Sequence, residues 1–146
     1  MSNGACAMHR EVFSRGNYPE QFRNAEDIPV FAQALANFPC TTLEHVLALI
    51  HKHDDSLRHQ FNYAKAGGVA LVDEVFSSKR LGNELMCLKQ DFFIQRCLSL
   101  FRIAYLAGEK KAAWQYYRQA LRADKAVLLK WSYTRKAVRL WLGRFS

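Results

Sequence analysis

The feature that most constrains the fold is a long apolar stripe in the second half of the chain. Between Leu81 and Ala107, apolar side chains return every three or four residues, which is the period of an α-helix with one buried face. Gly108 is expected to end this helix, and two further amphipathic helices are predicted over residues 110–123 and 125–142. Helices should therefore supply most of the hydrophobic core.

The first third of the chain has a different character, because all three prolines lie in it. A short helix is predicted from Pro29, which suits the first turn of a helix, to a residue before Pro39, which cannot continue one. Residues 43–50 are rich in leucine and β-branched residues. We expect them to form a buried strand, although eight residues are too few to exclude a helix.

These patterns predict an α+β fold that is mainly α. Residues 1–60 would form a small mixed α/β part, and residues 61–146 a basic helical bundle. A helix is expected over residues 56–76, with an interruption at Gly67 and Gly68, since two adjacent glycines weaken a helix interior.

The composition excludes several classes of protein. A chain of 146 residues, half of them hydrophobic, can bury a core of its own. No apolar run approaches the roughly 18 residues that span a bilayer, and the first residues lack the layout of a signal peptide. The four cysteines, at positions 6, 40, 87 and 97, have no metal-binding or disulfide spacing, so we expect reduced thiols and a cytoplasmic location.

The positive charge is concentrated at the C-terminal end. The net charge is +8, and residues 101–146 alone carry 11 basic and 2 acidic residues interleaved with aromatic ones. This pattern is compatible with a solvated helix face, with an acidic partner, or with peripheral attachment to the anionic surface of an inner membrane. It contains no nucleic-acid-binding motif, so no nucleic-acid partner is expected.

Candidate catalytic residues lie at the start of the helix that Pro29 opens. Glu26 and Asp27 precede it, where a carboxylate interacts favourably with the free N–H groups of the first turn. Taken alone, this pair favours a helix-capping role over catalysis. Its sequence context points to a different role.

Three segments occur in a characteristic order. Residues 3–13 contain small residues and then Arg10, residues 16–22 read Gly-Asn-Tyr-Pro-Glu-Gln-Phe, and residues 25–36 carry the Glu-Asp pair at a helix start. Together they resemble the acceptor-side half of family 2 glycosyltransferases of the GT-A fold. In that family a small-residue strand ends in an arginine, a loop of the type Gly-x-Phe-x-Glu-x-Phe follows, and a Glu-Asp pair opens a helix. Here Tyr18 replaces the usual phenylalanine of the loop.

The resemblance implies an inverting sugar transfer from a nucleotide-sugar to a hydroxyl group, in bacterial cell-envelope glycan synthesis. Asp27 matches the general base that takes the proton of the acceptor hydroxyl, and Glu26 would orient the acceptor or Asp27 itself. The acceptor would be a glycan or a lipid-linked molecule. The residues placed near the donor pocket by the resemblance are Asn3, Gly4, Ala5 and Arg10.

A second group of polar residues follows the expected strand. His51 and His53 would point to one face of an extended segment, and the resemblance matches them loosely, with Ser56 and Arg58, to positions that hold the metal and the diphosphate. The residues alone are equally compatible with a strand end exposed to water. A divalent cation, Mg²⁺ or Mn²⁺, is expected for the complete enzyme.

The nucleotide-binding half of the family has no counterpart in this sequence, which contains no Asp-x-Asp segment and no glycine-rich phosphate loop. By this interpretation the chain is an incomplete enzyme, inactive alone and without a cation of its own, and a strand edge left open would favour self-association. The alternative interpretation is a non-catalytic basic helical module that binds a membrane surface or a protein partner.

Overall fold

The computed structural model describes residues 5–22, 25–46, 48–49 and 67–143, and it is mainly helical. No strand occurs in these residues. The helices, with 3-10 helices labelled η, are η2 (Arg10–Arg15), η3 (Glu20–Phe22), α1 (Asp27–Asn37), α3 (Leu71–Val75), η5 (Asn83–Leu88), α4 (Lys89–Leu106), α5 (Lys110–Ala123), η6 (Lys125–Leu129) and α6 (Trp131–Leu142).

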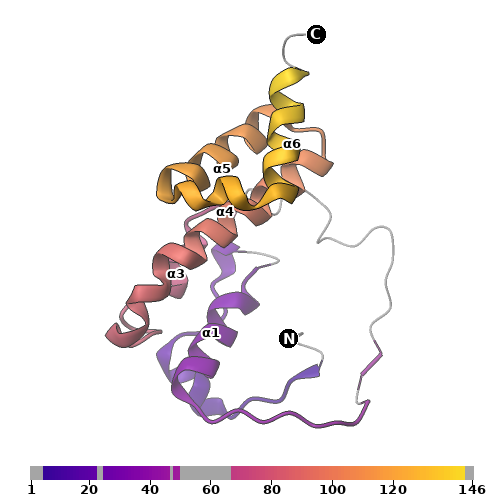
Figure 1. Cartoon of the computed structure of the whole chain (residues 1–146). Coiled ribbons are helices and arrows are strands. Elements are labelled where there is room, and N and C mark those ends of the chain that lie inside the picture. Colours follow the sequence, from indigo (N-terminus) through magenta and orange to yellow (C-terminus); the bar gives the residue numbers. More distant parts are fainter. Residues whose placement is uncertain (1–4, 23–24, 47, 50–66, 144–146) are drawn as a thin grey trace.

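Helix α4 connects two groups of helices (Figure 1). One end packs with α3, and α1 in turn packs against α3 and η2. Along its length α4 packs against α5, and α6 completes this C-terminal group. Among the described residues, no helix is both long and apolar enough to cross a bilayer.

The largest hydrophobic core lies between α4, α5 and α6. Its centre is Phe101, which is fully buried and whose ring lies 5.5 Å from that of Tyr117, centroid to centroid. Small residues let helices approach closely, and α5 and α6 both carry buried alanines on the sides that face this core. These fully or nearly fully buried alanines are Ala113, Ala120 and Ala137.

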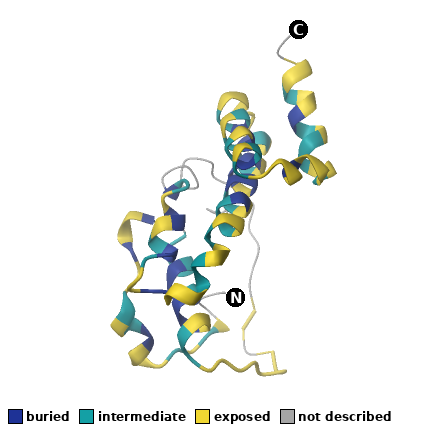
Figure 2. Cartoon of the chain, turned by 60° about the vertical axis from the view of Figure 1, so that its left-hand side comes forward, coloured by how far each residue is buried: buried dark blue, intermediate teal, exposed yellow. Residues whose placement is uncertain are grey.

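Two smaller clusters hold the N-terminal helices. One is formed by Phe22 together with α3 and the segment up to Leu81, and part of α1 packs against it. The other joins η2 to α1 through Val12, Val30 and Ala34. The burial pattern in Figure 2 follows this division, with buried residues on α1, α3 and α4 and a long exposed segment after α1.

The strand expected over residues 43–50 is not present in the described part of that segment. Leu43, Val46 and Leu49 are 67%, 84% and 80% exposed, and no described strand lies beside them. A strand is stable only when a neighbour pairs with its backbone groups and one face is covered. The mixed α/β character expected for residues 1–60 is therefore absent from the described residues.

The helix predictions agree better with the structure. The helix expected from Pro29 to a residue before Pro39 is α1, the helix predicted over residues 110–123 is α5, and Gly108 ends α4 with a φ of +75°. Of the helix expected over residues 56–76, residues 56–66 lie outside the described part; Gly68 sits in a turn that precedes α3.

The predicted helix over residues 125–142 is divided in two. Asp124 caps the short helix η6 by accepting a hydrogen bond from the backbone N–H of Ala126 at 2.8 Å. The chain then turns at Lys130, whose ψ of 72° is not helical. The hydroxyl of Thr134 donates to the carbonyl of Leu128 at 3.0 Å, so a side chain of α6 satisfies a carbonyl that the break leaves without a helical partner.

Candidate functional site

The pair Glu26 and Asp27 stands at the N-terminal end of α1, as the sequence predicts. Glu26 is the residue that precedes the helix, and Asp27 is the acid of its first turn. Glu26 makes no side-chain hydrogen bond to the helix start, so a side-chain cap is not observed, whereas Asp27 occupies the first-turn position in which a carboxylate interacts favourably with the helix dipole. Asp27 is partly exposed.

The two carboxylates differ in their surroundings. One oxygen of Glu26, Oε2, is buried and has no hydrogen-bond partner among the described residues. A buried carboxylate oxygen without a partner is destabilising by about 1–3 kcal/mol or more. A hydrogen-bond donor beside Oε2, from the protein or from a bound molecule, would therefore stabilise this arrangement.

The segment that carries Arg10 lies beside α1. Gln33 of α1 is fully buried, and its Nε2 donates to the carbonyl oxygens of Val12, at 2.9 Å, and Gly16, at 2.6 Å. These bonds fix η2 against the helix that Asp27 opens. Arg10 itself and Ala5 are exposed, so both are accessible to a ligand.

A buried arginine completes this attachment, and the sequence analysis did not identify it. Arg80 is 5% exposed and donates from Nη1 to Oε1 of Gln33 at 2.6 Å and from Nη2 to the carbonyl of Asn17 at 2.8 Å. Its ion pair with Glu74 measures 2.7 Å. Arg80 thus connects the loop at residues 16–17, α1 and α3.

Six of the other eight predicted site residues lie outside the described part of the chain. The residues assigned to the donor pocket, the metal and the diphosphate that lie outside the described part are Asn3, Gly4, His51, His53, Ser56 and Arg58. Within the described ranges, no three metal-ligating side chains come together.

Two depressions in the surface lie elsewhere. The larger, of about 730 Å³, is lined by α3, η5 and the start of α4, including Val72, Met86 and Phe93. The smaller, of about 280 Å³, lies between α5 and α6. Neither is lined by Glu26, Asp27 or Arg10.

The cysteines offer no activated nucleophile in the helical core. Cys97 is fully buried, and burial raises the pKa of its thiol to about 11. Burial also raises the pKa of Tyr116 and lowers that of Arg96. A thiol with a raised pKa is almost entirely protonated at neutral pH and reacts slowly.

Comparison with known proteins found no matching family model, no similar curated protein and no similar solved structure.

Proposed function

We propose that this chain is the acceptor-side part of an inverting glycosyltransferase, and that Asp27 is its general base. The observation that carries the proposal is the placement of the Glu-Asp pair. It opens a helix, as the family's pattern requires, and the segment with Arg10 lies against the same helix. The resemblance to family 2 glycosyltransferases supplies the chemistry, and the local geometry is compatible with it.

Asp27 suits the removal of a proton from an acceptor hydroxyl. A carboxylate in the first turn of a helix interacts favourably with the N–H groups there. A weak base is sufficient, because the hydroxyl becomes acidic only as its oxygen bonds to the sugar carbon. Glu26 would act as a positioning residue that orients the acceptor or Asp27.

Donor binding is assigned to a nucleotide-binding half outside this sequence. Mg²⁺ or Mn²⁺, if bound in the complete enzyme, would neutralise the diphosphate of the leaving nucleotide. The candidate ligands His51 and His53 lie outside the described residues.

The test is sugar transfer by the product of the native reading frame, including any coding sequence before codon 1. We would measure acceptor-dependent release of nucleoside diphosphate from nucleotide-sugars, for the wild type, Asp27→Asn and Asp91→Asn. Asp91 is a matched control, because it is also an acid in the first turn of a helix, α4, and is exposed. We expect at least about a 100-fold loss for Asp27→Asn and no loss for Asp91→Asn.

Two further results complete the test. Glu26→Gln should raise KM for the acceptor more than it lowers kcat, because an amide oxygen accepts a weaker hydrogen bond than a carboxylate and Glu26 takes no proton in the reaction. If no nucleotide-sugar is turned over, or if Asp27→Asn retains full activity, the proposal is wrong.

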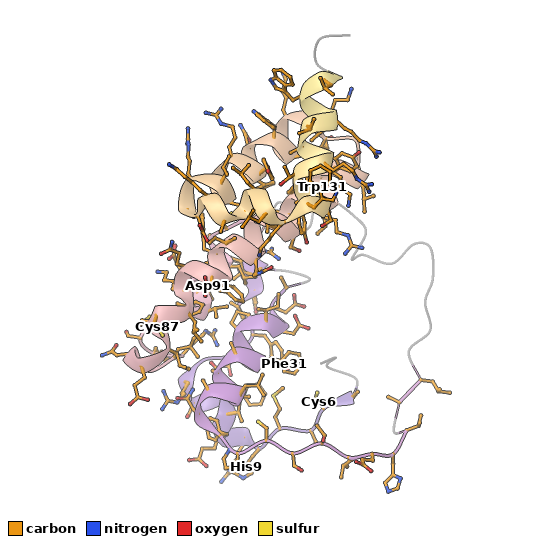
Figure 3. All side chains as sticks on the ribbon, in the orientation of Figure 1. Cys6, His9, Phe31, Cys87, Asp91 and Trp131 are labelled. Carbon is orange, nitrogen blue, oxygen red and sulfur yellow. The ribbon has the colours of Figure 1, made fainter. Side chains whose placement is uncertain are left out.

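A second candidate function is attachment to an anionic membrane, and the exposed face of α6 favours it. Trp131, Val138 and Leu142 are 70%, 49% and 55% exposed. Their spacing of seven and four residues places them on one side of the helix. The exposed Arg135 and Arg139 adjoin this stripe. Figure 3 shows Trp131 at the start of α6, far from His9 and Phe31 in the N-terminal part.

Apolar and basic residues side by side on one helix are typical of helices that lie in the membrane interface. We would therefore measure co-sedimentation of the full chain with phosphatidylserine vesicles. Arg139→Glu should weaken binding at least about tenfold, because each basic residue near the surface contributes about 1 kcal/mol. Arg102→Glu, an exposed reversal on α4, is the control.

Salt gives the second criterion. Raising the salt concentration from about 0.1 M to 1 M shortens the Debye length from about 10 Å to 3 Å. The higher concentration should release the protein from the vesicles. Binding that is independent of salt, or equal on phosphatidylcholine vesicles, would exclude this function. Loss of vesicle binding would leave the transferase proposal intact, since the two use different residues.

A further inference from the structure

The groove between α5 and α6 has the properties of a binding site for a slender apolar molecule. It has a volume of about 280 Å³ and runs between two helices that are joined by η6. The side chains that give it its apolar character are Trp114, Leu121, Leu128, Ala137, Val138 and Trp141.

The polar groups in its lining are already paired. The hydroxyl groups of Tyr117 and Thr134 lie 2.9 Å apart and share a hydrogen bond. Thr134 also contacts the carbonyl of Leu128 at 3.0 Å. These hydroxyls therefore have little to offer a ligand, and a molecule in the groove would gain mainly from burying hydrocarbon.

The rim of the groove is positively charged. On α5, Arg118 is four residues after Trp114 and three before Leu121. On α6, Arg135 is three residues before Val138. Residues three or four apart are neighbours on a helix surface, so both arginines adjoin residues that line the groove. Both are exposed, and no described acidic side chain forms an ion pair with either. The only acidic residue between positions 110 and 142 is Asp124. An anionic group at the rim would meet no negative charge from these helices other than that of Asp124.

We propose that this groove binds the acyl chain of an anionic lipid, with the head group against Arg118 and Arg135. A partner helix is about 10–12 Å across with its side chains, so only some of its side chains could enter a groove of 280 Å³. A second copy of the chain would bring the same positive charge to the same rim and be repelled. The inference rests on the second candidate function, because the membrane to which the basic helices bind would supply the lipid.

The tryptophans allow a direct test. The chain has three: Trp114 and Trp141 line the groove, and Trp131 does not. The probe is 12-bromododecanoate below its micelle concentration, because a bromine atom quenches tryptophan fluorescence on contact. In full-length Trp131→Phe, which keeps both groove tryptophans, quenching should be strong and saturable. In Trp114→Phe/Trp141→Phe, which keeps only Trp131, it should be weak.

Two variants test the groove without removing a tryptophan. Val138→Glu places a carboxylate at the lining and should weaken binding of the probe at least about tenfold by repulsion and desolvation. Val138 is half-exposed, so the fold should tolerate the change, which circular dichroism can confirm. Leu129→Glu adds the same charge at an 85% exposed position outside the groove and should leave binding unchanged.

The following results would overturn the inference: equal quenching of Trp131, equal affinity for a cationic amphiphile of the same chain length, or full binding by Val138→Glu. Vesicle binding, measured in parallel, separates the two proposals. Vesicle binding without quenching would refute the groove and leave membrane attachment standing. Quenching without vesicle binding would contradict the membrane as the source of the lipid.

Discussion

Replacing Arg80 by methionine should destabilise the protein by about 3–5 kcal/mol, the range measured when one partner of a buried ion pair is removed. The structure gives the reason. Methionine keeps much of the side-chain volume, but Oε1 of Gln33, the carbonyl of Asn17 and the carboxylate of Glu74 each lose a donor. The side chain of Gln33 is fully buried and would carry the full penalty of about 1–3 kcal/mol. Glu74, at 26% exposure, would recover part of its loss from water.

The assay is urea unfolding followed by circular dichroism, with Lys79→Met as the control. Lys79 is the exposed neighbour of Arg80, and its replacement should change the free energy of unfolding by no more than about 0.5 kcal/mol. If Arg80→Met is as stable as Lys79→Met, the hydrogen bonds described for Arg80 do not hold the N-terminal helices in place.

Two further predictions concern the helical core and its connections. Because burial raises the pKa of Cys97 from 9.0 to about 11, the folded state keeps the proton that the unfolded state loses. The stability of the wild type relative to Cys97→Ala should therefore fall between pH 9 and pH 11, as measured by urea unfolding; a constant difference would contradict the buried thiol. Gly108→Ala should be destabilising by about 1–2 kcal/mol, since φ is +75° there, whereas Gly82→Ala, at φ −67° with open space around it, should be nearly neutral in thermal unfolding.

Local pattern was sufficient to predict most of the helices. The apolar stripe from Leu81 to Ala107 and the glycine at position 108 are features of neighbouring residues, and α4 and its end follow from them. The predicted start at Leu81 was wrong, because α4 begins only at Lys89, after the separate 3-10 helix η5. The break at Lys130 was missed because it depends on a side chain of the following helix, Thr134, and not on a proline or glycine at the break itself.

Long-range pairing was beyond the reach of sequence patterns. Gln33 and Arg80 are 47 residues apart, and the residues around each of them do not predict that the two side chains pair. One signal was available: Gln33 interrupts an otherwise apolar helix, and a polar residue on a buried face requires a partner. The strand predicted over residues 43–50 failed for the related reason that a strand needs a neighbour, which the described part of the chain does not provide.

The candidate site was predicted in part. The position of Glu26 and Asp27 at a helix start follows from Pro29 two residues later, and the structure confirms it. Their roles depend on residues outside the described ranges and on the resemblance, so the assignment of Asp27 as the base remains a prediction.

The most direct measurement of that assignment is the single-turnover rate of sugar transfer at saturating donor and acceptor. Under these conditions binding differences disappear and only the chemical step is compared. For Asp27→Asn we predict a rate at least about 100-fold below that of Asp91→Asn, with both variants folded as judged by circular dichroism. Equal rates would show that the acid at the start of α1 takes no proton from the acceptor.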